Sequence, residues 1–208
     1  MQQVHVIVPG KRAALFLKKH LFEINQGPLI PPKIMILPEW LQTISSVKNI
    51  AGFESTLDLY KSYLAVAETP EDFNAFMKWS SHALNDFNDV DQYLVDGRQI
   101  FQNIKDIKAI DSWSLHQDPL SEVQQKFLQF WDELGAVYHH FQNESDTHQR
   151  WNYAQVARRL AEKKIEFHSD ATDTYFVGLS RLTPAEEKVI TLFQKSHHSV
   201  SLHWDADA

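Results

Sequence analysis

The feature that most constrains this fold is an apolar strand that runs through a glycine into a helix at the start of the chain. Four of the five residues at positions 4–8 are valine or isoleucine, which predicts a buried strand. Pro9 and Gly10 break this strand, and residues 11–24 then follow an amphipathic helical pattern. Phosphate-binding loops of α/β proteins stand between a strand and a helix in this way. The order predicts an α/β fold with a loop placed where a nucleotide phosphate would bind.

The phosphate chemistry of such a loop is incomplete. The pattern G-x-x-x-x-G-K-[ST] supplies two glycines, a lysine and a hydroxyl that binds magnesium. Here a single glycine, Gly10, precedes Lys11, and Arg12 stands where the hydroxyl is required. We interpret Gly10, Lys11 and Arg12 as a degenerate phosphate-like site and expect no catalytic residue among them.

Three more segments predict buried strands, at positions 33–37, 174–179 and 199–204. A helix is expected from Pro38, because proline suits the first turn. Another is expected at positions 183–194, where Thr183-Pro184-Ala185-Glu186 has the pattern of a capping box. Strands that alternate with helices indicate a parallel sheet.

The segment 54–167 shows helical periodicity and no strand pattern. Its helical pieces are expected at 54–68, 70–95, 98–108, 120–143 and 151–166. Apolar residues recur on one face of two of these pieces, and they are Phe73, Phe76, Met77, Leu84, Phe87, Phe127, Phe130, Trp131, Leu134, Val137, Tyr138 and Phe141. We interpret them as core and not as a platform for base stacking, since helix packing requires this spacing. The prediction is an α/β domain of residues 1–53 and 168–208 with an inserted helical subdomain, 54–167.

Composition limits the class of protein. With 208 residues, 43% of them apolar, the chain can bury a sizeable core. It has no cysteine, which excludes disulfides, thiolate zinc sites and a cysteine nucleophile. The first residues lack the apolar run of a signal peptide or a membrane span, so we expect a cytoplasmic protein without a membrane partner.

Charge is distributed unevenly along the chain. Residues 1–53 carry six Lys/Arg against two Asp/Glu, whereas 54–167 carry eleven against nineteen. Contacts with nucleic-acid phosphates should therefore favour the N-terminal part. The candidate residues are Lys11, Arg12, Lys18 and Lys19. The alternative is that they form only a solvated helix face.

One pattern superficially matches a nuclease. Asp173 with Glu186-Glu187-Lys188 resembles D…E-x-K, in which carboxylates and a lysine converge on a metal. Here the E-x-K falls in the first turns of a capped helix, where negative charge is favourable. We therefore interpret these carboxylates as helix-terminal charges.

Metal and cofactor sites find no support in the sequence. The acidic run 86–91 fails the calcium-loop template, so we interpret it as the polar face and end of a helix, followed by a turn at Asp96-Gly97. The eleven histidines include no His-x-x-x-His with a helical glutamate, and G-x-S-x-G is also absent. We expect no metal, no cofactor and no covalent hydrolysis.

Five strings together carry a resemblance to a known family. They read V-I-V-P-G-K-R-A, I-L-P-E-W-L, W-S-S-H-A-L-N-D-F-N-D-V-D-Q-Y-L, F-x-x-F-W-x-x-L-x-x-x-Y and Y-F-V-G-L-S-R-L-T-P-A-E-E-K. These strings span nearly the whole chain. It resembles the N-terminal region of AddB-like proteins, in the variant of Bacteroidetes-type bacteria. These are subunits of helicase-nucleases that repair DNA double-strand breaks.

The resemblance implies a helicase-like parallel sheet with degenerate motor motifs, which serves DNA handling and assembly with a partner helicase-nuclease subunit. It places a PD-(D/E)XK exonuclease domain beyond residue 208 and leaves this part of the protein non-catalytic. In superfamily 1 helicases the strand after the helical insertion ends in Asp-Glu, whereas Phe176-Val177-Gly178-Leu179 stands here where that strand ends, without either acid. Because the chain closes on a predicted strand without a following helix, we expect it to be a fragment.

Three alternatives stay open. Gly178 either permits a tight turn or lets a DNA strand approach the backbone closely. Gly10 and Lys11 can still hold a nucleotide phosphate at a helix N-terminus, as a divergent P-loop-like domain would. The aromatic-rich helical insertion can instead be a protein-interaction module without DNA contact.

Overall fold

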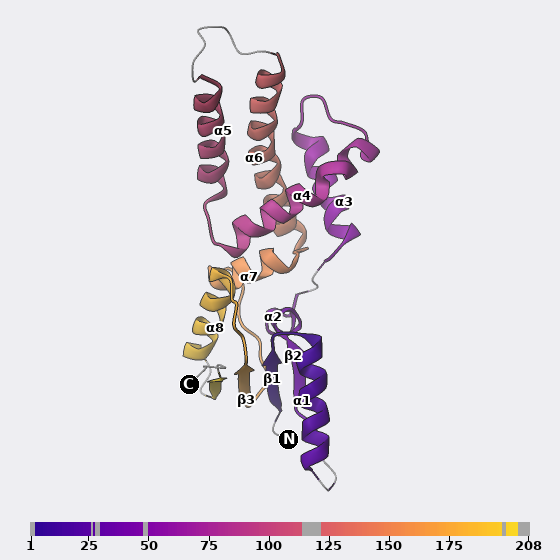
Figure 1. The fold of residues 1–208 in the computed structure, drawn as a ribbon, viewed down its shortest axis with the longest axis vertical. Helices are drawn as coiled ribbons and strands as arrows, with labels where there is room; N and C mark the ends of the chain where they lie inside the picture. The colour runs from indigo at the N-terminus through magenta and orange to yellow at the C-terminus, as the bar shows by residue number, and fades with distance from the viewer. Residues whose placement is uncertain are drawn as a thin grey trace. The chain divides into compact units, whose positions relative to one another are not determined.

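A computed structural model describes residues 3–25, 27, 30–47, 50–113, 122–196 and 199–203, the side chains of 105, 107–113, 122–130 and 132 excepted (Figure 1). The chain divides into two compact units. The first consists of residues 1–49 and 156–208 and contains the sheet. The second consists of residues 50–155 and is helical among its described residues. The predicted α/β class with a parallel sheet is confirmed.

The sheet has four parallel strands, β1 (Val4–Val8), β2 (Lys33–Ile36), β3 (Asp173–Val177) and β4 (Val200–His203). Their order is β2-β1-β3-β4. All four predicted strands exist. β2 and β3 end earlier than predicted, and residue 204 of the predicted last strand lies outside the described residues. The strand order reverses between β1 and β3, which is the switch point of a doubly wound sheet.

Three helices follow strands of this sheet: α1 (Lys11–Ile24), α2 (Leu37–Ser45) and α8 (Pro184–Ser196). α1 has the predicted bounds. α8 begins with the predicted capping box, in which Thr183 N donates to Glu186 Oε2 at 2.7 Å and Glu186 N donates to Thr183 Oγ1 at 3.4 Å. The sequence therefore marks these helix starts correctly.

The core of the first unit forms where α2 and α8 cover one face of the sheet. The Trp40 ring meets Phe176 edge-on at 4.8 Å between centroids and Phe193 at 5.1 Å. Phe176 pairs in register with Ile7, so both side chains point to this face. β2 and β4 lie on opposite sides of the strands that precede them, so right-handed crossovers place α1 and α8 on opposite faces.

The helical unit contains α3 (Phe53–Val66), α4 (Phe73–Gln92), α5 (Gly97–Trp113) and α6 (Glu122–His148), and the boundary between the units falls within α7 (Tyr153–Ala161). α5 and α6 lie side by side (Figure 1). The core consists of Leu59, Tyr63, Phe76, Ala83, Phe87, Val90, Phe101, Leu134, Val137, Tyr138 and Phe141. The interpretation of the two aromatic stripes as core is confirmed for six predicted residues, and three more pack against the core partly buried: Phe76, Phe87, Leu134, Val137, Tyr138 and Phe141, and then Phe73, Leu84 and Trp131. It is wrong for Met77, which is 40% exposed because it lies on the solvent side of α4. The side chains of Phe127 and Phe130 lie outside the described set.

The turn predicted at Asp96-Gly97 is wrong. Asp96 Oδ1 accepts hydrogen bonds from the backbone N of Arg98 at 2.9 Å and of Gln99 at 3.3 Å, so Asp96 caps α5. A Cβ on Gly97 would lie 2.2 Å from Cε1 of Tyr138. The glycine therefore serves the close approach of an aromatic ring, and the chain turns earlier, at Leu94, whose φ is 56°.

The end of the acidic run also differs from its prediction as a polar helix face. Asp91 is buried, with 1% of its surface exposed. Its Oδ2 accepts a hydrogen bond from Nε2 of Gln142 at 2.8 Å. A buried carboxylate is tolerated when such donors replace water. No helix among the described residues is long and apolar enough to span a membrane.

Candidate functional site

The candidate site lies at the carboxyl edge of the sheet, where β1 and β3 end side by side. The two strands are parallel and pair as far as Ile7 with Phe176, so the loops that follow them start at the same edge. Gly10 lies in the loop after β1 and Gly178 in the loop after β3. Ligands of doubly wound sheets bind in the crevice that opens at such a switch point. The strand order thus brings together two sequence-predicted residues that are distant in the chain.

The N-terminus of α1 faces this edge, and its first turn contains no carboxylate. Gly10 is the N-cap, no side chain caps the helix, and its first turn has no acidic residue. Helices leave their first N–H groups without an intrahelical acceptor and carry a partial positive charge there. Lys11 and Arg12 are exposed in the same turn. This end of α1 therefore favours anions.

The two glycines differ in what they require. Gly10 is extended (φ −168°, ψ 166°), a conformation open to any residue. Gly178 has φ +68°, and its N donates to the carbonyl of His203 at 2.8 Å, so the turn interpretation accounts for glycine there. At both positions a Cβ would meet nothing within 4 Å. The backbone is therefore open to a ligand at both loops.

The groups needed for phosphate hydrolysis do not follow β3. Gly178 and the buried Leu179 come directly after β3, and Arg12 follows Lys11, so these positions supply neither a carboxylate nor a hydroxyl. Among the described residues, no three His, Asp or Glu side chains group so as to hold a metal ion. The edge offers anion contacts without magnesium ligands at these positions.

Lys18 and Lys19 lie two turns further along α1. Residues seven apart share a helix side, so Lys11 and Lys18 line one flank, and Arg12 and Lys19 the other. The Nζ of Lys19 lies 3.7 Å from Oε1 of Glu23. About 10 Å along the axis separates the two pairs. The sequence-predicted cations thus form two groups on α1.

One cation at this edge escaped the sequence reasoning. Arg181 lies in the loop between β3 and α8 and is exposed. Nothing in its local sequence signals a site. The adjacency of β1 and β3 places its loop beside that of Gly10, and this adjacency emerges only from the sheet order.

The nuclease-like residues do not converge. Asp173 is the first residue of β3 and its carboxylate accepts a hydrogen bond from Ser199 Oγ. Glu186 caps α8, which begins after the other end of β3. Five strand residues span about 13 Å. The interpretation of Glu186 as a helix-terminal charge is confirmed.

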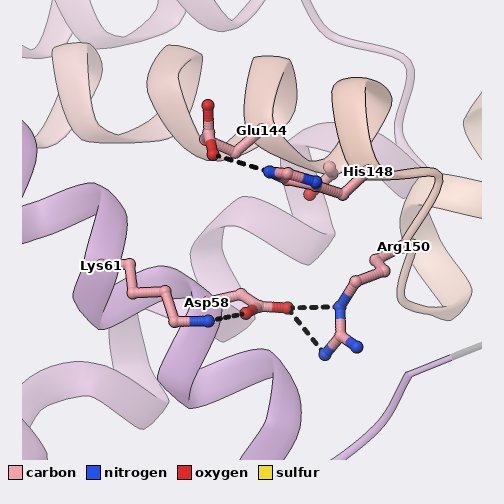
Figure 2. A pocket seen from close by; sticks show the side chains of 6 residues that line it. Asp58, Lys61, Glu144, His148 and Arg150 are labelled. Carbon is pink, nitrogen blue, oxygen red and sulfur yellow. Dashed lines mark hydrogen bonds and ion pairs between the residues drawn. The ribbon is translucent and has the colours of Figure 1, made fainter.

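A polar pocket of about 270 Å³ lies in the helical unit and is lined by Asp58, Lys61, Glu144, Ser145, His148 and Arg150 (Figure 2). Asp58 Oδ2 accepts from Nε and Nη2 of Arg150, both at 3.1 Å, and Asp58 Oδ1 accepts from Lys61 Nζ at 3.0 Å. His148 Nε2 lies 3.3 Å from Glu144 Oε2. Because Asp58 already pairs with both Lys61 and Arg150, we interpret this cluster as a structural ion-pair network that links α3 to the segment after α6. Its members are too distant in sequence to form a motif.

His5 is a buried titratable group in β1 that the sequence reasoning passed over. Its exposed fraction is 0%, and neither ring nitrogen has a hydrogen-bond partner among the described residues. Burial lowers the pKa of His5, the charge of Lys33 lowers it further, and Asp170, 3.5 Å from Nε2, acts in the opposite direction. Burial in the sheet therefore favours the neutral form of the ring.

No protein-family model matches the chain, and no curated protein matches its sequence.

Proposed function

We propose that this chain is a helicase-like α/β domain with a helical insertion, which contacts DNA phosphates and does not hydrolyse ATP. On this proposal it serves DNA handling and assembly with a partner subunit in an AddB-like protein for double-strand-break repair. One observation carries the proposal. The uncapped N-terminus of α1, with Lys11 and Arg12, lies at a switch point where Gly178 and Leu179 stand in place of carboxylates.

The missing carboxylates separate phosphate contact from phosphate cleavage. Phosphoryl transfer depends on a metal ion, a phosphate cradle and an oriented water, since positioning and charge neutralisation supply most of the catalysis. Of these three requirements, the edge offers only parts of a phosphate cradle, namely the N-terminus of α1 with Lys11 and Arg12. A DNA backbone needs only cations and backbone N–H donors for its phosphates.

The experiment is binding of a fluorescein-labelled single-stranded oligonucleotide, followed by anisotropy over a range of salt. Lys11, Arg12 and Arg181 together would neutralise about three phosphates, so the slope of log K against log salt should be about −2. Lys11→Ala should weaken binding and reduce the magnitude of this slope by about 0.7.

Lys195→Ala is the matched control, because it removes an exposed lysine of the same unit from the last turn of α8. It should leave both affinity and slope near the wild-type values. Equal loss in both variants would show a general charge effect and no site at α1. Binding that is absent at low salt would favour the helical unit as a protein-interaction module.

A divergent nucleotide site is the second candidate, and the same uncapped helix N-terminus favours it. ATP should then raise the melting temperature, and Lys11→Ala should abolish the rise. ATP turnover that disappears in Lys11→Ala would overturn the claim that this domain is catalytically inactive.

A further inference from the structure

α1 exposes several apolar side chains to solvent, of which Leu15 and Phe22, seven residues apart, share one side of the helix. None of its residues is buried, and Leu15, Phe16, Phe22 and Ile24 are all exposed, Phe22 to 83%. Ile30, in the segment that follows, is 73% exposed. Scattered apolar residues on a surface are ordinary, but a contiguous patch marks an interaction site.

This face includes a groove. A hollow of about 260 Å³ lies between the second half of α1 and the segment that leads into β2, and its apolar lining includes Leu21, Phe22, Pro31 and Ile34. Lys18 stands among the lining residues. The groove adjoins β2, which is at the end of the sheet order. A hollow of this size accommodates one or two bulky apolar side chains.

The charge around the groove is positive. Lys18, an exposed residue of the lining, forms no ion pair with any described residue. Glu23, the sole acidic residue of α1, lies 3.7 Å from Lys19 and 3.4 Å from His20. An occupant must therefore bring carboxylates together with apolar side chains.

Other occupants fit less well. Two copies of α1 packed antiparallel, with Leu15 against Phe22, would bring Lys18 and Lys19 of one copy against those of the other, which like-charge repulsion opposes. DNA would neutralise the lysines but leave the aromatic rings in water. A lipid surface would cover the exposed rings. It is broad, however, and does not project one bulky apolar group into a concave groove, as a protein side chain does.

We propose that this α1 groove docks an amphipathic helix of a partner protein, with a Leu or Phe anchor in the hollow and Asp or Glu one turn away facing Lys18. Helix-in-groove recognition uses anchors at i, i+3 or i+4, and i+7, which α1 can meet along its length of about 20 Å. The groove is at the end of α1 opposite Gly10. The inference therefore does not depend on DNA binding at that loop.

The test is an amide NMR titration of the full chain with two synthetic helical peptides. Both carry the same Leu and Phe stripe, and they differ only in Glu or Lys at the flanking positions. The Glu peptide should shift amides of α1 and the segment before β2, with an affinity at least about tenfold above that of the Lys peptide. Phe22→Ala should weaken binding of the Glu peptide about fivefold or more, and Lys18→Glu should weaken it by a similar factor.

Leu64→Ala is the control, because it truncates an exposed leucine of the helical unit and should leave binding unchanged. Equal affinity for the two peptides, shifts outside the groove, or no shift at millimolar peptide would overturn the proposal. Binding to phosphatidylserine vesicles that depends on Phe22, without binding of the Glu peptide, would also overturn it and assign the patch to a membrane surface.

Discussion

The phenol oxygen of Tyr138 in α6 donates a 2.7 Å hydrogen bond to Oδ1 of Asp91 in α4, and both residues are buried. Gln142 donates to the other carboxylate oxygen and receives a bond from Nε2 of Gln155 at 3.3 Å. Gln155 in turn caps α7 reciprocally with Asn152, each bond being 3.0 Å long. A connected polar network thus ties α4, α6 and the start of α7 within the helical unit.

Tyr138→Phe should lower the free energy of unfolding by about 1.5–3 kcal/mol, because it removes a buried hydrogen bond to a carboxylate without changing the ring. Urea unfolding measures this. Tyr93→Phe is the control, since Tyr93 is 58% exposed, and it should change the free energy by less than about 0.5 kcal/mol. Equal changes in the two variants would show that the hydrogen bond between Tyr138 and Asp91 does not stabilise the fold.

Gly97→Ala should destabilise the helical unit by about 1–3 kcal/mol, because the added methyl would overlap the Tyr138 ring. Gly10→Ala supplies the comparison. Its Cβ would meet nothing within 4 Å and its backbone is extended, so only the weaker N-cap preference of alanine should act, and the loss should stay below about 1 kcal/mol. Thermal unfolding of both variants checks the prediction, and a stable Gly97→Ala would mean that the ring moves aside at little cost.

Local signals predicted the elements well. α1 has the predicted bounds because a strand-breaking Pro9-Gly10 precedes it and its pattern is unbroken. The capping box at Thr183 and Glu186 is a signal of four adjacent residues, and the structure contains it. Such features depend on neighbours in the chain, which the sequence displays.

Features that depend on distant residues escaped prediction. Gly97 resembled a turn because glycine commonly permits one, yet the reason for this glycine is a ring in α6. In the sequence Asp91 resembled a solvated carboxylate, whereas in the fold it is buried and accepts hydrogen bonds from Tyr138 and Gln142. At the candidate site, the loops of Gly10 and Arg181 become neighbours only through the order of the strands.

Trp40→Ala should cost the first unit about 3–5 kcal/mol, since the indole is fully buried against Phe176 and Phe193. Trp40→Phe should cost much less, because Nε1 of Trp40 has no hydrogen-bond partner among the described residues and an aromatic ring is retained. Near-ultraviolet circular dichroism during urea unfolding reports both. Similar losses in the two variants would contradict ring packing as the source of stability.

His5 should make stability depend on pH. Burial lowers the pKa of His5 in the folded chain below the unfolded value of 6.5, so the unfolded state takes up a proton first as the pH falls. The contribution of neutral His5 is fully present above about pH 6.5 and decreases as the pH falls from there toward the folded pKa. The free energy of unfolding should therefore rise with pH across this window, as urea titrations at about pH 5 and about pH 7 would measure.

His5→Leu separates this effect from that of other groups. The variant removes the titrating ring from β1, so the rise in stability between the two pH values should be smaller than in wild type. His139, whose pKa burial also lowers, contributes in the same direction and remains in both proteins, so the difference between the two slopes isolates His5. Asp170→Asn removes the one nearby charge that raises the pKa of His5 and should steepen the dependence. An unchanged slope in His5→Leu would show that the buried imidazole is not the titrating group.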